Sequence, residues 1–229
     1  MKHRINGLLP GFLIGLAFVL LTTAGSLMAK EDEFPEVTVD GLHRVADSKL
    51  AVVYAEPGAD LSQYNRILLL DAHVAFKKNW ERNQRSSSAL TRKVTSKDIE
   101  KIKNTLAAEF QTIFQTTLEE GGYEVVTEPG EDVLLVRPAI INLDVNAPDT
   151  PRAGSTMTFA QSAGEMTLYV ELYDSVTSDL IAKALDRRVD NSRAGSYTWT
   201  NSVTNTRAAQ RILKGWATIL LDALDEARQ

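Results

Sequence analysis

The hydrophobic residues of this chain change their periodicity along the sequence, and the order of the changes restricts the fold more than any single motif does. Apolar residues recur every three or four positions over 99–118 and again over 202–224, as on one face of an amphipathic helix. Between them, 123–189 contains stretches in which apolar and polar residues alternate, which is typical of strands with one buried face. The pattern predicts strands between two long helices and excludes repeated βαβ units.

Local signals set the expected limits of the first elements. The even-numbered residues from Leu68 to Phe76 are apolar, so they are expected to form the buried face of a strand over 66–76. Ser96 is the expected N-cap of the first helix, and Gly121 and Gly122 are expected to end it.

Four more strands are expected before the second helix. They cover 123–127, 132–145 and the two arms of a hairpin over 165–189. In 132–145 the expected buried residues are Ala139, Ile141, Leu143 and Val145, and Pro138 suggests an edge strand or a bulge. The predicted order is β-α-β-β-β-β-α, an α+β fold with a mainly antiparallel sheet and two helices packed on one face.

The first 29 residues have the pattern of an export segment. Lys2 and Arg4 precede an uncharged stretch, 5–29, which ends in small residues at Ala29. A cleaved signal peptide fits this pattern, and an uncleaved membrane anchor through 5–29 is the alternative. The rest of the chain is exported in both cases, so a periplasmic location is expected. Residues 30–60 are interpreted as a flexible lead-in to a single domain over 61–229.

The composition excludes several classes of function. The net charge of −5 argues against a nucleic-acid partner. The absence of cysteine excludes disulfides, thiolate metal sites, a cysteine nucleophile and lipid attachment at an N-terminal cysteine. Three isolated histidines, His3, His43 and His73, do not form a metal site, and no catalytic or phosphate-binding motif is present. No enzyme activity, catalytic residue, metal or cofactor is therefore expected.

One segment is strongly basic although the chain as a whole is acidic. Residues 77–97 hold seven basic residues and a single acid, Glu81, and they also contain Trp80. Such a segment can contact anionic headgroups or an acidic partner, or it can be a solvated loop. The candidate binding residues are Lys77, Lys78, Arg82, Arg85, Arg92 and Lys93.

A tetrapeptide, Arg-Ala-Gly-Ser, occurs at 152–155 and again at 193–196. One copy precedes the predicted hairpin and the other follows it, so both are expected at the open end of the hairpin. A ligand site on this rim and a pair of ordinary surface loops are both compatible with the pattern. The candidate rim residues are Arg152, Ser155, Arg193, Ser196, Tyr197 and Trp199.

Several segments together resemble a bacterial family of secreted proteins, many of them lipoproteins, known as the domain of unknown function 3313 family. The matching segments are 57–69 with Asp-Leu-Ser-x-Tyr, 74–80, 137–141, 171–177 with Asp-Ser-x-Thr, and 216–217. The resemblance covers about residues 50–227 and implies a compartment and a fold, but no catalytic residue. The chain departs from the family in lacking the lipid-bearing cysteine and in having Ser178 where a turn glycine is usual.

Three functional hypotheses follow. The leading one is a non-enzymatic periplasmic or envelope binding or accessory protein, whose partner is an envelope protein or an anionic envelope component. The alternative is a hydrolase or small-ligand-binding protein that uses the loops Arg152–Ser155 and Arg193–Ser196. The third is a structural subunit that oligomerises through the edge of the strand containing Pro138.

Overall fold

The computed structural model describes residues 34–87, 95–145, 159–160, 164–189, 198–199 and 202–229. Three helices and two sheets are formed within these ranges. The strands are β1 (His43–Arg44), β2 (Val52–Ala55), β3 (Arg66–Leu69), β4 (His73–Phe76), β5 (Glu124–Val126), β6 (Val133–Val145), β7 (Phe159–Ala160), β8 (Gly164–Asp174), β9 (Leu180–Val189) and β10 (Thr198–Trp199). The helices are α1 (Trp80–Ser87), α2 (Ser96–Glu120) and α3 (Ser202–Ala227).

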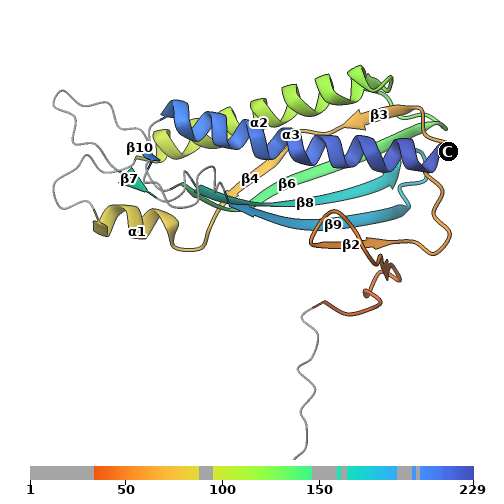
Figure 1. Cartoon of the computed structure of the whole chain (residues 1–229), viewed down its shortest axis with the longest axis horizontal. Coiled ribbons are helices and arrows are strands. Elements are labelled where there is room, and N and C mark those ends of the chain that lie inside the picture. Colours follow the sequence, from red (N-terminus) through yellow and green to blue (C-terminus); the bar gives the residue numbers. More distant parts are fainter. Residues whose placement is uncertain (1–33, 88–94, 146–158, 161–163, 190–197, 200–201) are drawn as a thin grey trace, which may run out of the picture. The chain divides into compact units, whose positions relative to one another are not determined.

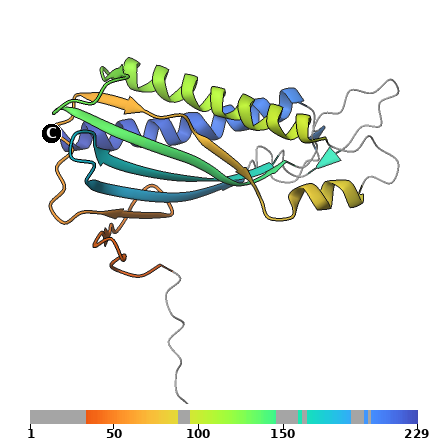
Figure 2. The same ribbon diagram turned by 180° about the vertical axis from the view of Figure 1, so that it is seen from behind.

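The main sheet has eight strands in the order β1-β2-β9-β8-β6-β3-β5, and β4 also pairs with β6. The pairs β1/β2, β2/β9, β9/β8 and β8/β6 are antiparallel, whereas β3 and β4 run parallel to β6, and β5 runs parallel to β3. Helices α2 and α3 pack against each other on one face of the sheet (Figure 1). The view from behind shows the same arrangement (Figure 2). The predicted α+β class is confirmed.

The segment predicted as one strand over 66–76 is two strands separated by Leu70, Asp71 and Ala72. Ile67 and Leu69 are buried in β3, and Val74 is buried in β4. The predicted even-numbered buried face is therefore wrong for β3, because the break shifts the alternation by one residue.

Pro138 lies in the centre of the sheet rather than at an edge. The pairing of β3 with β6 ends at Val136, and that of β4 begins at Ala139, so Pro138 faces the gap between the two short strands. A proline is tolerated there because its missing N–H would have no partner strand to bond. Strand β6 is paired on both sides, so the predicted oligomerisation through its edge is wrong.

A bulge changes which residues of β6 face the helices. The register of β6 against β8 shifts between Ile141 and Asp144, and Asn142 has a positive φ of 52°. Before the bulge Val136 and Ile140 are buried in the core, and after it Leu143 is. The expected burial of Ala139 and Ile141 on the helix side is therefore wrong.

Part of the predicted flexible lead-in belongs to the sheet. Strand β2 pairs with β9, and β1 pairs with β2, so the prediction does not hold for 34–60. Leu42, Val52 and Tyr54 form a second small core on the sheet face opposite the helices, with Phe34 packed against it. Residues 1–33 lie outside the described part of the chain.

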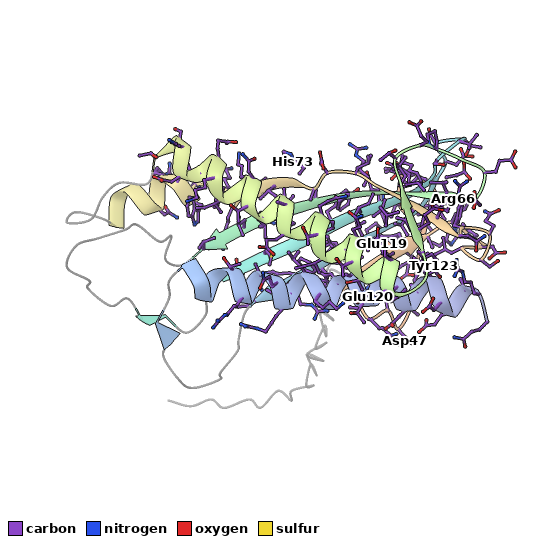
Figure 3. The ribbon with its side chains drawn as sticks, turned by 90° about the horizontal axis from the view of Figure 1, so that it is seen from above. Asp47, Arg66, His73, Glu119, Glu120 and Tyr123 are labelled. Carbon is purple, nitrogen blue, oxygen red and sulfur yellow. The ribbon has the colours of Figure 1, made fainter. Side chains whose placement is uncertain are left out.

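The helix ends agree with the predicted signals to within one residue. The N-cap of α2 is Thr95 rather than Ser96, because Thr95 forms a capping box with Asp98. Gly121 ends the helix, and Gly122 follows it with a φ of 87°, which favours glycine. In Figure 3, Glu119 and Glu120 at this end of α2 lie near Tyr123, and His73 lies well apart from them.

Helix α3 is fixed to the sheet by a buried carboxylate. Asp186 of β9 is 6% exposed, and one of its oxygens accepts hydrogen bonds from Trp216 Nε1 and from Arg188 Nε, both at 2.7 Å. The other oxygen accepts a hydrogen bond from the backbone N–H of Ala51 at 3.0 Å. Asp186 thus connects α3, β9 and the start of β2 at one point in the core.

The C-terminal end of α3 is held by residues that directly precede β5 and β3. Tyr123 Oη donates to Asp225 at 3.1 Å, and the Arg228 guanidinium lies 3.8 Å from the centre of the Tyr123 ring. Tyr64 Oη donates to Asp174 at 3.0 Å. Burial, followed by the neighbouring carboxylate, raises the pKa of each of these two tyrosines to about 12.

Candidate interaction face on the sheet

The sheet face turned away from α2 and α3 carries an ordered set of polar and aromatic side chains. In β8 the even-numbered residues Met166, Leu168, Val170 and Leu172 belong to the helix-side core, so the odd-numbered residues point to the other side. The strand pairings extend this set to β6 and β9. We define the open face as Leu135, Arg137, Ala139, Ile141, Glu165, Tyr169, Glu171, Tyr173, Lys183, Leu185 and Arg187. Thr167 points to the same side but is buried, and Leu185 packs against the small core of Leu42, Val52 and Tyr54.

Glu171 is at the centre of a hydrogen-bonded group on this face. Tyr169 Oη donates to Glu171 Oε1 at 2.7 Å, and Tyr173 Oη donates to Oε2 at 3.0 Å. Arg137 Nη1 lies 3.4 Å from the same Oε2. Burial and the Glu171 carboxylate raise the pKa of both tyrosines, so the phenols remain neutral donors. Both carboxylate oxygens are occupied, and both rings are held in place.

A second group of charges surrounds Glu165 at the other end of the open face. Lys77 Nζ donates to Glu165 Oε1 at 2.9 Å and reaches Asp144 Oδ2 at 3.5 Å. Arg187 pairs with the other oxygen of Glu165. The hydrogen bond from Lys77, helped by Arg187, lowers the pKa of Glu165, so this carboxylate is charged at neutral pH.

The carboxylates of both groups lie beneath their cations. The side chains of Glu171 and Glu165 are 16% and 17% exposed, whereas Arg137 and Arg187 are 63% and 60% exposed. Each guanidinium uses only part of its five donors on its carboxylate. A molecule that approaches the open face therefore meets the arginines before it meets the acids.

The segment before β1 borders the open face on the β9 side. Asp40 pairs with Lys183, whose side chain is 17% exposed. Next to Asp40, Val39 is fully exposed, and Val37 is 47% exposed. These valines place apolar side chains at the edge of a largely polar surface.

The predicted basic segment is in part a helix rather than a loop. Trp80 begins α1, is buried, and stacks on Phe76 with ring centres 4.1 Å apart. Lys77 belongs to the Glu165 group, whereas Lys78 and Arg82 are exposed beside it. The backbone of Arg85 lies in α1, but its side chain, together with Arg92 and Lys93, lies outside the described residues.

The predicted rim site falls mostly outside the described part of the chain. This applies to Arg152, Ser155, Arg193, Ser196 and Tyr197 and to the side chain of Trp199. The backbone of the flanking segments is described, and β7 pairs with β10 so that Phe159 lies opposite Trp199. The two segments that follow the repeated tetrapeptides thus meet in a short ladder.

The sequence had a signal for the open face that was not used to predict a site. The alternation in 165–173 shows one polar and aromatic side of a strand, which is the side that carries Tyr169, Glu171 and Tyr173. What the sequence lacks is the pairing that brings Arg137 to Glu171. Among the described residues, no cluster of three or more metal-ligating side chains occurs. No helix in those ranges combines the length and apolar character needed to cross a membrane.

The described structure thus defines a mixed α+β domain with one sheet face packed by helices and one carrying ordered polar groups. A family model, Protein of unknown function (DUF3313), matches residues 32–220, and the chain belongs to this family. The resemblance noted in the sequence is confirmed. No curated protein matches the chain.

Solved structures with partial similarity include proteins from three bacteria. A PelC dodecamer from Paraburkholderia phytofirmans is 12% identical, with 71% of this chain and 94% of that chain covered and a TM-score of 0.34. A neuraminyllactose-binding hemagglutinin homolog from Helicobacter pylori is 10% identical, with 73% and 86% covered and a TM-score of 0.41. A DUF4136 family protein from Bacteroides thetaiotaomicron is 9% identical, with 75% and 95% covered and a TM-score of 0.35. At these values the likeness gives no information about function.

Proposed function

We propose that this protein is a non-enzymatic binding or accessory module of the bacterial envelope, and that its open face binds a partner protein. One observation carries the proposal. Two tyrosines and two exposed arginines are held in fixed positions by Glu171 and Glu165 on a sheet face that α2 and α3 leave uncovered. Tyrosine and arginine are among the residues that contribute most to the binding energy of protein interfaces, and their fixed positions lower the entropy lost on binding.

The export segment supports the location. Residues 1–29 direct the chain out of the cytoplasm, and the domain works in the periplasm, free after cleavage or held by an uncleaved anchor. Cell fractionation of the full chain and of a variant without residues 2–29 tests this step. The full chain is expected in the envelope fractions and the shortened variant in the cytoplasm. If the full chain and the shortened variant were found in the same fractions, the proposed role of residues 1–29 in export would be contradicted.

Photo-crosslinking in living cells tests the binding surface. A photoreactive amino acid is placed at Ala139 and at Ile141, which lie near Arg137 on the open face, and at Lys101 and Thr112 of α2 as controls. Defined protein adducts are expected from the first pair and not from the second. Adducts from α2 alone, or from no position, would contradict the proposed surface.

A ligand site at the hairpin rim is a second candidate, and the β7–β10 ladder favours it because it joins the segments that follow the two Arg-Ala-Gly-Ser copies. The test replaces Arg152, Ser155, Arg193 and Ser196 together by alanine. Sugars and short peptides are then screened for thermal stabilisation of both proteins and for turnover. A ligand that stabilises the wild-type chain and not the variant supports the rim site, and the same response from both removes it.

A further inference from the structure

We infer that the partner of the open face is an acidic protein segment whose carboxylates bind the Arg137 and Arg187 guanidiniums. This inference rests on the proposed function and adds the chemistry of the partner. Arg137 and Arg187 are more than half exposed, whereas the acids beneath them, Glu171 and Glu165, are mostly covered. In these two pairs the accessible partner is therefore the cation. The carboxylates of Asp144 and Asp40 near the face are paired with Lys77 and Lys183.

The hydrogen bonds of the acids remove the main source of repulsion against an acidic partner. Glu171 accepts from two tyrosine hydroxyls and lies against Arg137, so both of its oxygens are used. Glu165 is paired through both oxygens with Lys77 and Arg187. The remaining guanidinium N–H groups match the bidentate geometry of a carboxylate, which a lysine would not provide.

The spacing of the two arginines sets a length for the segment. In the strand register, Arg137 of β6 lies opposite Glu171 of β8. Arg187 of β9, the strand on the other side of β8, lies opposite Thr167, four residues away from Glu171. The offset is about 13 Å along the strands and about 10 Å across them, so the two Cα atoms are about 16 Å apart. An extended chain covers this distance in about five residues. Along β8, Tyr169 lies between the positions opposite the two arginines, whereas Tyr173 lies beyond Glu171.

A membrane surface fits these observations less well than a protein does. Anionic headgroups are bound by mobile lysine and arginine side chains near the bilayer. Among the described residues, Lys78 and Arg82 at the start of α1 are exposed cations of this kind. The arginines of the open face are instead each paired with a carboxylate, and Arg137 shares Glu171 with two fixed tyrosines, as expected for the centre of a protein interface.

The probe for the test is a fluorescent decapeptide of alternating glutamate and threonine, and its control has lysine in place of glutamate. Binding to the full exported domain is measured by anisotropy, and the contact residues are mapped by amide chemical shifts. The acidic peptide is expected to bind and to shift the amides of β6, β8 and β9 around Arg137 and Arg187. The double variant R137E/R187E should lose at least about tenfold in affinity, whereas K101E on α2 should bind as the wild-type chain does.

A further variant and a second probe separate the outcomes. R137K/R187K keeps the charges but not the planar guanidinium, so its affinity should lie between the wild type and the reversal. Vesicles of phosphatidylglycerol are tested in parallel. Absence of peptide binding, shifts confined to α1, or vesicle binding that R137E/R187E weakens would each overturn the inference. If the acidic peptide does not bind but the photo-crosslinks from Ala139 and Ile141 are found, the proposed function stands and only the acidic partner is wrong.

Discussion

The two faces of β8 are built from alternate residues of one strand, yet they have opposite roles. Toward the helices, Met166, Leu168, Val170 and Leu172 are buried in the main core with Trp216. On the open face, Tyr169 and Glu171 are only half-buried and bond with each other. The comparison teaches that stability depends on the first face, and that the second face can change with little effect on folding. Substitutions on the helix side are therefore expected to lower the free energy of unfolding more than substitutions on the open face.

The largest effect is expected from Trp216, the biggest side chain in the helix-side core. Trp216→Ala removes a side chain that is 1% exposed and leaves a cavity between α3 and the sheet. A loss of about 3–5 kcal/mol in the free energy of unfolding is expected, measured by urea denaturation. Thr218→Ala, at an exposed position of the same helix, is the control and should change stability little. A loss from Trp216→Ala as small as that of the control would show that α3 does not hold the core together.

The next effect is expected from Asp186, a buried carboxylate on the helix side of the sheet. Asp186→Ala leaves Trp216 Nε1 and the Ala51 N–H without their acceptor, at a cost of about 2–3 kcal/mol. Arg187→Ala is the matched control, because its side chain points to the open face and is 60% exposed. The same denaturation experiment measures both. Equal losses from the two variants would contradict the proposed difference between the faces.

The tyrosines give a prediction for alkaline pH. Tyr64 and Tyr123 have a pKa raised to about 12, so the folded state favours their neutral form. The associated stability is fully present below the unfolded pKa of about 10 and is lost as the pH rises from there toward 12. The double variant Tyr64→Phe/Tyr123→Phe should be less stable at neutral pH by about 2 kcal/mol, through two lost hydrogen bonds. Its stability should also fall less steeply above pH 10 than that of the wild type, followed by thermal melting and phenol absorbance. Parallel curves for the two proteins would refute the assignment.

The smallest effect is expected on the open face. Glu171→Gln should change the free energy of unfolding by less than about 1 kcal/mol, because the carboxylate is bonded to partly exposed groups. The pKa of Tyr169 and Tyr173 should move back toward the ordinary value without reaching it, because burial is the larger cause of the shift. Denaturation and phenol titration measure the two quantities. A loss of stability comparable to that of Asp186→Ala would show that both faces stabilise the fold.

Much of the fold could be predicted from the sequence because its periodicities are strong. The two long helices and the hairpin needed only the spacing of apolar residues, and both helices were correctly expected on one face. Errors arose where a local break changes the alternation, at Leu70–Ala72 and at Asn142. The strands β1 and β2 were missed because two and four residues are too few to show a period.

The candidate site could be predicted only in part. The basic residues of 77–97 were visible from composition, but the pairing of Lys77 with Glu165 joins residues that are 88 positions apart. The same applies to Arg137 and Glu171, whose contact depends on the register of β6 against β8. A single sequence shows which side of a strand is polar, and it does not show which residues of other strands lie on that side.

The bulge at Asn142 also affects how relatives of this protein are aligned. A relative that lacks the extra residue would present, in every position after it, the side chains that here point the other way. An alignment that places the resulting gap in a neighbouring loop would then match core residues with surface residues along the end of β6. Insertions and deletions within this family should therefore be compared by the face on which a residue lies, rather than by its order in the chain.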